Sequence, residues 1–322
     1  MEYKLGTIFW KVVLCLMTPI LIFSCQNDDN VEPVEFTESI VIIPDIQYYT
    51  NTPERFHYLE SIADYTKREM RNISVCLQVG DVTNNNEDWQ WENAYQEFFT
   101  KLPADLPFVY CLGNHDYGDN GYSGKRESNQ PDNMRLTGDF SLSNSKYDNY
   151  IKLVNLGSQK YAILSLEFAP RNEVLDWANE MINDYSDTYF VILTHAFLNN
   201  QGKLFDSTDS NCDNKYSQKS YKMGGEYLND SKEIYDKIVF NNTNVKMVIC
   251  GHCLYKDFIA TEFVKNSMGN DVPCIMVNYQ HDIDGGSGNI GLLAFKNKKF
   301  YLYSYSTKFK MFTRFFTSFA VN

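Results

Sequence analysis

Polar residues that can bind a metal ion follow five separate apolar runs of this 322-residue chain. Short apolar runs are typical of buried strands, and the ends of neighbouring strands can hold side chains rigidly at one edge of a sheet. Carboxylates, amide oxygens and imidazoles together form a set of ligands suited to divalent metals. The pattern therefore predicts an α/β protein with a metal site built from Asp45, Asp81, Asn114, His195 and His252, with Gln47, His115 and Asp116 close beside them in the sequence.

A glycine directly precedes three of these residues. Glycine permits sharp turns and close approach of the backbone to other groups. We therefore expect the side chains after each glycine to be able to point at a common metal. The glycines are Gly80, Gly113 and Gly251.

Strand-like and helical segments alternate in the first half of the chain, and consecutive strands follow near its end. This order predicts an α/β fold with mixed sheets. Two polar segments without periodicity, 117–149 and 199–229, are expected to be long surface loops. Strands are expected at 39–44, 73–79, 107–112, 161–168, 189–193, 245–250, 273–279, 290–295 and 299–305, and helices at 53–71, 87–102, 172–184 and 231–240.

The chain is acidic, with a formal net charge of -12. We find no basic run that offsets this charge, so a nucleic acid is not expected as a partner. A small phosphorylated substrate drawn in by a metal is compatible with the composition. Lys125, Arg126 and Arg135 in the first long loop could supply a local positive edge for it.

The first 24 residues have the features of a signal peptide. Lys4 and Lys11 precede an apolar run, residues 12–23, that is short for a membrane-spanning helix. Cys25 then follows a small residue, which resembles the lipobox of bacterial lipoproteins, and residues 26–29 resemble the acidic tether of surface-exposed ones. An ordinary secretory signal is the alternative.

These features predict four parts: a signal peptide at 1–24, a tether at 25–37, the main domain at 38–306 and a C-terminal tail at 307–322. The predicted location is the bacterial cell envelope, as a surface-exposed outer-membrane lipoprotein. The lipid on Cys25 would be its only contact with the membrane.

In their order along the chain, the polar motifs resemble those of the calcineurin-like metallophosphoesterase superfamily. The likeness covers residues 40–306, and its most specific part is the run 113–116, Gly-Asn-His-Asp, which follows the pair Gly80-Asp81. Residues 166–171 and 278–280 also resemble a bacterial secreted branch of that superfamily. The resemblance implies one four-layer α/β/β/α domain with two mixed sheets. It also implies hydrolysis of a phosphomonoester or phosphodiester by a metal-bound hydroxide.

The resemblance further implies a role for each residue. Asp81 would bridge two divalent metals, which Asn114, His195 and His252 complete on one side and Asp45 on the other. His115 would stabilise the transition state or protonate the leaving oxygen, with Asp116 fixing its tautomer. Glu167 and Arg171 could orient the substrate phosphate, although Arg171 is equally placed to begin the helix at 172.

The sequence departs from the family pattern twice, and both departures concern the Asp45 side. The usual Asp-x-His reads Asp45-Ile46-Gln47, and the usual Gly-His-x-His ends in Leu254. We therefore expect weaker metal binding there, with preference shifted from Zn²⁺ toward Mn²⁺, Mg²⁺ or Ca²⁺. The pair of ions as a whole could be Mn, Fe, Zn, Mg or Ca, and His281 is a candidate replacement ligand.

Two other functions remain open. A surface lipoprotein with a weakened metal site could bind a glycan or nutrient without catalysis, although such a protein would not need His115. Cys250 and Cys253 also form the Cys-x-x-Cys pattern of thiol–disulfide oxidoreductases. Ile249 stands where those enzymes usually have Trp, and a redox site would leave the other motifs unexplained.

Overall fold

The computed structural model describes residues 31–321 apart from 123–124, 135–137, 143–147 and 224–226. The predicted signal peptide, the lipidation site Cys25 and the basic residue Arg135 lie outside the described residues. Within the described part of the chain, no helix has the length and apolar character needed to cross a membrane.

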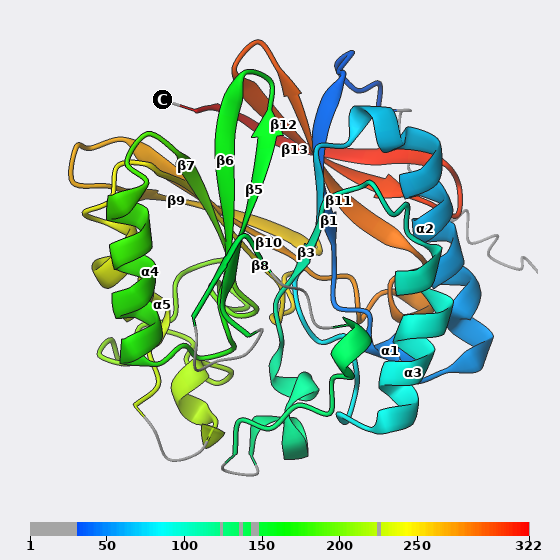
Figure 1. Ribbon diagram of the computed structural model, residues 1–322, viewed down its shortest axis with the longest axis horizontal. Coiled ribbons are helices and arrows are strands. Elements are labelled where there is room, and N and C mark those ends of the chain that lie inside the picture. Colours follow the sequence, from blue (N-terminus) through cyan, green and yellow to red (C-terminus); the bar gives the residue numbers. More distant parts are fainter. Residues whose placement is uncertain (1–30, 123–124, 135–137, 143–147, 224–226, 322) are drawn as a thin grey trace, which may run out of the picture.

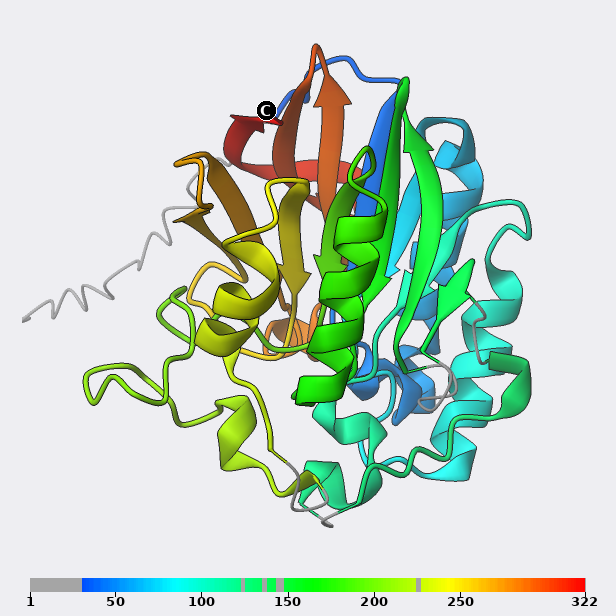
Figure 2. The ribbon, with the colours of Figure 1, turned by 60° about the vertical axis from the view of Figure 1, so that its left-hand side comes forward.

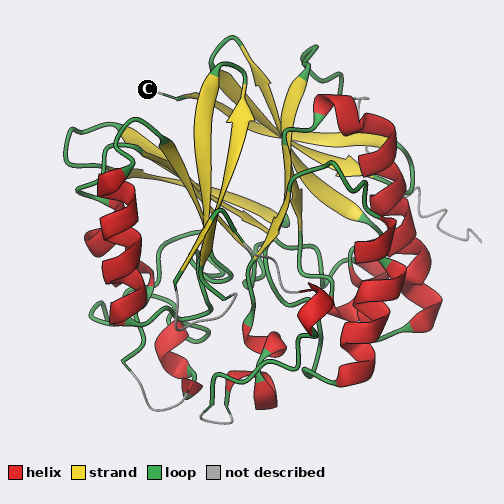
Figure 3. Cartoon of the chain, viewed as in Figure 1, coloured by secondary structure: helices red, strands yellow, loops and turns green. Residues whose placement is uncertain are grey.

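Two mixed β-sheets face each other, and helices cover their outer faces (Figures 1 and 3). The strand order is β13-β12-β11-β1-β2-β3 in the first sheet and β4-β5-β6-β7-β8-β10-β9 in the second. The predicted four-layer α/β/β/α architecture is confirmed.

The first sheet is parallel on one side and antiparallel on the other. Its strands β1, β2 and β3 run parallel, so their carboxyl ends lie at the same edge. The helices α2 and α3 cover its outer face (Figure 1). The elements are β1 (Glu38–Ile43), α1 (Gln47–Thr50), α2 (Phe56–Glu69), β2 (Val75–Gln78), α3 (Asp88–Glu97), β3 (Phe108–Tyr110), β11 (Asn289–Lys296), β12 (Lys299–Ser306) and β13 (Met311–Ala320).

The second sheet has a parallel centre, formed by β6, β7, β8 and β10. Figure 2 shows α4 and α5 in front of it. Helix α4 packs through Val174, Leu175, Ala178 and Ile182, whose spacing of one, three and four residues is that of one helix face. The elements are β4 (Phe140–Ser141), β5 (Tyr150–Leu156), β6 (Gln159–Ser165), α4 (Asn172–Asp184), β7 (Tyr189–Leu193), α5 (Ser231–Ile234), β8 (Val245–Cys250), β9 (Ile259–Lys265) and β10 (Asp271–Val277).

Short turns of helix complete the chain. One five-residue π-helical turn, Tyr235–Val239, continues α5. The others are 3₁₀ turns at Pro53–Arg55, Met70–Asn72, Phe99–Lys101, Asn114–Asp116, Gly118–Gly121, Asp132–Met134, Gln218–Ser220 and Ile283–Gly285.

Alternate residues of the central strands point into two different cores. In β1, Ile40 and Ile42 belong to the core between the sheets, whereas Val41 and Ile43 belong to the core under the helices. Burial of both faces is why such strands read as continuous apolar runs. Each fully buried aliphatic side chain contributes about 1.5–3 kcal/mol to folding, so the loops that follow these strands start from rigid supports.

The prediction of a C-terminal tail at 307–322 is wrong. Residues Met311–Ala320 form β13, which pairs with β12 along its whole length and extends the first sheet. The strands β4, β5 and β9 were also missed. The segments 117–149 and 199–229 are largely irregular in their described residues, as predicted.

Candidate metal centre

The predicted ligands lie in the loops that follow the parallel strands of both sheets. These loops gather at one side of the molecule, at the lower edge in Figures 1 and 3. Six polar residues come one to four positions after a strand end: Asp45 after β1, Asp81 after β2, Asn114 after β3, His195 after β7, His252 after β8 and Asn278 after β10.

Asp81, His195 and His252 form a compact group in which one ligand atom from each lies within 4.8 Å of the others. Nε2 of His195 is 3.2 Å from Oδ1 of Asp81 and 3.2 Å from Nδ1 of His252. The structure thus brings together three residues that are 114 and 57 positions apart in the chain. One carboxylate and two imidazoles at this spacing can hold a divalent cation.

Backbone carbonyls fix which nitrogen of each imidazole carries hydrogen. Nδ1–H of His195 donates to the carbonyl of Val79 at 2.7 Å, and Nε2–H of His252 donates to that of Tyr216 at 2.9 Å. A carbonyl oxygen can only accept, so the remaining nitrogen of each neutral ring presents a lone pair. The two lone pairs face each other, which requires a cation or a proton between the rings.

The charges of the group follow from this geometry. Burial lowers the pKa of His195, but the carboxylates of Asp81 and Asp45 outweigh burial and raise it to about 9. Burial, followed by the charge of His195, lowers the pKa of His252 to about 3. Burial opposes ionisation of Asp81, yet the neighbouring histidines hold its pKa below the usual value. Without metal, a proton on His195 occupies the place that a cation would take.

Two buried amide oxygens provide an independent test of whether a metal fits. Oε1 of Gln47 and Oδ1 of Asn114 have no hydrogen-bond partner among the described residues. Both side chains are almost fully buried, and the Gln47 amide nitrogen donates to Oδ2 of Asp81 at 3.1 Å. Buried polar atoms without partners are rare and call for an unseen ligand or ion. Both oxygen atoms belong to predicted metal ligands, so these residues fit a bound metal ion.

The backbone is strained or closely packed at the predicted ligands. Asp81 and His252 have left-handed φ angles of 53° and 69°, which non-glycine residues adopt mainly where the surrounding structure imposes them. A methyl group on Gly113 would overlap the Asp81 carboxylate, and one on Gly251 would overlap that of Asp45. The close approach expected at these glycines is confirmed.

On the Asp45 side of the group, the described residues offer only oxygen atoms as metal ligands. Oδ1 of Asp45 accepts from the backbone N–H of His252 at 3.3 Å, and Oδ2 accepts from Nδ2 of Asn278 at 2.9 Å. Burial and the charge of Asp81 raise the pKa of Asp45, although His195 offsets part of this. Asn278 was not predicted as a site residue, although it directly follows an apolar strand, as the other candidates closely do.

His281, the expected replacement ligand, does not join the group. Its side chain is exposed, and its ring stacks on Tyr48 with centroids 6.2 Å apart. The prediction is wrong because the chain turns after Tyr279, whose carbonyl accepts from the N–H of Asp282. Asn278 occupies the position beside Asp45 instead.

His115 is half-buried at the edge of the site. Its backbone N–H donates to Oδ1 of Asp81 at 3.0 Å, and Nδ1–H donates to the carbonyl of Asn84 at 2.7 Å. The prediction that Asp116 fixes this tautomer is therefore wrong. The buried Asp116 carboxylate accepts from the backbone N–H groups of Val82, Thr83 and Gly113 and holds the two loops together.

Glu167 and Arg171 are directed at each other rather than at an open site. Two guanidinium nitrogens of Arg171 lie 2.9 and 3.1 Å from the carboxylate of Glu167, which is fully buried. Arg126 lies 3.4 Å from the same carboxylate and donates to the carbonyl of Phe168. Arg171 is also the residue that precedes α4. The phosphate-orienting role is therefore not supported for this pair, and Arg126 supports the loop of Phe168 instead of forming a positive edge.

Phe168 packs against both imidazoles, with ring centroids 5.9 Å from His195 and 5.7 Å from His252.

Cys250 and Cys253 are buried free thiols. Burial raises the pKa of Cys250 to about 12 and that of Cys253 well above its usual value. A reactive cysteine needs an accessible thiolate, so the burial and the raised pKa values of these two thiols argue against the redox alternative.

The model of the calcineurin-like phosphoesterase family matches residues 38–254, more than half of the chain. The chain therefore belongs to this family of metal-dependent phosphoesterases. The match includes all the predicted ligands except His281. No curated protein sequence matches the chain.

Two solved structures share the fold at 13% sequence identity. One is the purple acid phosphatase PPD1 from seeds of yellow lupin, Lupinus luteus, with a TM-score of 0.50 over 90% of this chain and 55% of that one. The chain thus spans about half the length of the lupin enzyme. The other is the anchor protein of the inner membrane complex of Plasmodium, with a TM-score of 0.51 over 89% of both chains.

Proposed function

We propose that the protein hydrolyses a small phosphate ester and uses two divalent metal ions that it holds unequally. The observation that carries this proposal is the pair of imidazoles whose lone-pair nitrogens face each other 3.2 Å apart beside the Asp81 carboxylate. Asp81, Asn114, His195 and His252 would hold the tighter ion. Asp45, Gln47 and Asp81 would hold the weaker one.

When bound, such ions lower the pKa of water and polarise phosphoryl oxygens. The protein's own contribution is to position these groups and to move a proton. His115 is suited to the second task because its Nδ1–H is fixed by the Asn84 carbonyl and leaves Nε2 to exchange a proton. We infer that His115 protonates the leaving oxygen.

We also propose that the protein is an outer-membrane lipoprotein anchored through Cys25. The support for this is the sequence alone: the apolar run before Cys25 and the acidic residues after it. The net charge of -12 favours a small substrate over a nucleic acid. Both a monoester and a diester are compatible with the site.

A non-catalytic binding role is the second candidate. It is favoured by the absence of an imidazole on the Asp45 side among the described residues, since a weakened second site could abolish turnover. The shared fold of a phosphatase and an anchor protein shows that the fold alone does not decide. The position of His115, bonded to Asp81 and Asn84, favours the enzyme.

The test uses a soluble form that begins at Gln26 and so keeps every described residue. After metal removal it is assayed with Mn²⁺ against bis-p-nitrophenyl phosphate and p-nitrophenyl phosphate. We expect metal-dependent turnover that falls about 10²- to 10⁴-fold in His115→Ala, the usual contribution of general acid catalysis. The matched control His57→Ala changes an exposed histidine on α2 and should retain full activity. Metal binding without turnover on either substrate would favour the binding role.

A further inference from the structure

The charge of the chain is divided very unevenly. Residues 296–322 contain six Lys or Arg and no Asp or Glu, so they carry +6 and the rest of the chain carries -18, for the total of -12. The basic residues are Lys296, Lys298, Lys299, Lys308, Lys310 and Arg314. These residues do not form a long basic run because aromatic and small residues separate most of them. Such asymmetry is typical of a surface that meets an anionic partner.

The same end of the chain exposes large apolar side chains. Phe309 is 66% exposed, Phe315 46% and Met311 36%. They lie in the turn before β13 and on β13 itself, the last strand of the first sheet. Phe315 lies opposite Tyr303 and Arg314 opposite Ser304, so their side chains project from the two faces of this edge strand. We call the exposed apolar side chains and the neighbouring cations of this edge the β13 patch, which consists of Lys308, Phe309, Lys310, Met311, Arg314 and Phe315.

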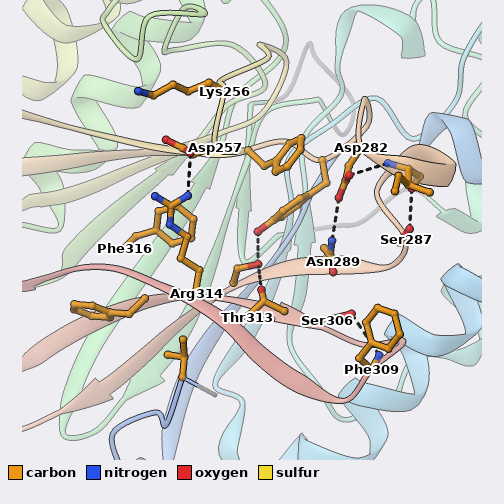
Figure 4. Close-up of a pocket in the computed structure, with 16 residues that line it drawn as sticks. Lys256, Asp257, Asp282, Ser287, Asn289, Ser306, Phe309, Thr313, Arg314 and Phe316 are labelled. Atoms are coloured by element: carbon orange, nitrogen blue, oxygen red, sulfur yellow. Dashed lines mark hydrogen bonds and ion pairs between the residues drawn. The ribbon is translucent and has the colours of Figure 1, made fainter. Parts of the chain in front are cut away.

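Basic and aromatic groups are interleaved within and beside this patch. Lys308 Nζ lies 5.5 Å from the ring centre of Phe309, and Cζ of Arg314 lies 4.8 Å from that of Phe316. Arg314 also pairs with Asp257 at 2.9 Å (Figure 4), while its side chain stays 52% exposed. Rings with cations beside them suit the interface of a bilayer, where apolar groups enter the headgroup region and cations meet lipid phosphates.

The beginning of the described chain reaches the same place. Val31 lines a groove of about 910 Å³ together with Arg314, Phe315 and Phe316. The backbone N–H of Val34 donates to the hydroxyl of Tyr303 on β12, the strand that pairs with β13. Cys25 precedes Val31 by six residues, which a fully extended chain spans in at most roughly 20 Å.

We propose that the β13 patch docks the protein on a bilayer surface with anionic headgroups. The exposed aromatic side chains enter the headgroup region, and Lys308, Lys310 and Arg314 attract the lipid phosphates. Two independent features favour this occupant. The patch contains three cations, one of them paired with Asp257, and no acidic residue, in an otherwise acidic protein. Val31 shows where the proposed anchor joins the domain. Docking would fix the orientation of the metal centre relative to the membrane, which an anchor at Cys25 alone would not do.

The test does not depend on the phosphoesterase function or on the lipid at Cys25. The soluble form beginning at Gln26 is mixed with vesicles of phosphatidylcholine, with or without phosphatidylglycerol, and bound protein is measured by cosedimentation. We expect binding to the anionic vesicles that weakens as salt is added. The double variant Lys308→Glu/Lys310→Glu should bind at least about tenfold more weakly, and Phe309→Ser/Phe315→Ser should also lose affinity.

The matched control is Lys67→Glu/Lys160→Glu, which makes the same change of net charge at exposed sites on α2 and β6. It should bind vesicles like the wild type, and all variants should melt near the wild-type temperature and keep phosphatase activity. Equal loss in the control and the patch variant would show an effect of net charge and overturn the proposal. Failure of the wild type to bind anionic vesicles would also overturn it, as would a dimer that the Phe309→Ser/Phe315→Ser variant dissociates without any vesicle binding.

Discussion

The two sides of the metal centre share Asp81 but offer different chemistry. The histidine side has two imidazoles with tautomers fixed by backbone carbonyls and the unpaired amide oxygen of Asn114. The Asp45 side has a carboxylate, whose two oxygens already accept hydrogen bonds, and the amide of Gln47. Among the described residues, the two sides therefore differ in the atoms that they offer to a metal: imidazole nitrogens on one side and oxygen atoms on the other.

This difference has a physical consequence for the two ions. Imidazole nitrogens bind Zn²⁺, Fe²⁺ and similar ions strongly, whereas neutral amide oxygens suit harder ions such as Mn²⁺ and Mg²⁺ and bind less tightly. We therefore expect the histidine side to fill first and the Asp45 side to depend on the metal concentration. Three substitutions, in order of decreasing effect, and the dependence of metal binding on pH test this comparison.

Asp81→Ala should disable both sides at once. Asp81 accepts from Gln47 and from the backbone of His115 and contacts His195, so its loss removes the carboxylate that both sides share. Loss of a residue that only supports a metal ligand commonly lowers metal affinity or activity 10–100-fold. Asp81 is itself a proposed ligand, so its loss should lower activity more than about a hundredfold. Metal analysis and turnover with Mn²⁺ measure the effect, with the exposed Asp187→Ala as control. Wild-type metal content in Asp81→Ala would contradict the assignment.

His252→Ala should remove the tighter ion selectively. The remaining ligands of that side, Asp81, Asn114 and His195, would lose the imidazole that faces His195 at 3.2 Å. We expect the affinity of the first ion to fall at least about tenfold while the weaker phase is unchanged. Calorimetric titration with Mn²⁺ separates the phases. If only the weaker phase disappeared, the histidine side would hold the weaker ion, which would contradict the assignment.

Gln47→His should reduce the difference between the sides. The substitution restores an imidazole beside Asp45, in place of an amide whose oxygen has no partner among the described residues. The second ion should then bind about tenfold more tightly, and Zn²⁺ should gain more than Mg²⁺. Gln47→Ala is the control, since it removes the amide without adding a ligand. An unchanged second phase in Gln47→His would mean that Gln47 does not face the ion.

Metal binding on the histidine side should strengthen with pH. In the metal-free protein the pKa of His195 is about 9, so below this pH the incoming ion must displace a proton. The apparent affinity should rise by about tenfold per pH unit between pH 6 and 8 and level off above about 9. Titrations in buffers of different ionisation enthalpy would measure the proton released. A pH-independent affinity for the first ion would contradict the raised pKa.

Most of the fold could be predicted because its central strands are buried on both faces. The runs at 39–44 and 73–79 correspond to β1 and β2, whose residues are almost all buried. The strand β13 was missed because it lies at the edge of its sheet: five of its ten residues are half-buried and the other five are exposed, so it lacks a buried apolar run. Edge strands depend on pairing with a neighbour, which sequence alone does not reveal.

The site could be predicted only as far as strand ends determine it. Asp45, Asp81, Asn114, His195 and His252 follow buried strands closely, and the structure brings them to one edge. Where a longer turn follows the strand, the sequence does not reveal in which direction a side chain points. The exposed His281 was therefore predicted as a ligand, and the buried Asn278 was not. The hydrogen-bond partners of the polar residues could not be predicted either. Asp116 accepts from backbone N–H groups, and Glu167 accepts from Arg171.

The most direct test of the account is one Mn²⁺ titration of the metal-stripped protein, with heat and turnover of bis-p-nitrophenyl phosphate recorded together. The account predicts two unequal binding phases, of which the tighter is lost in His252→Ala, and turnover that appears only with bound metal. Two ions of equal affinity, or turnover that persists without metal, would contradict it.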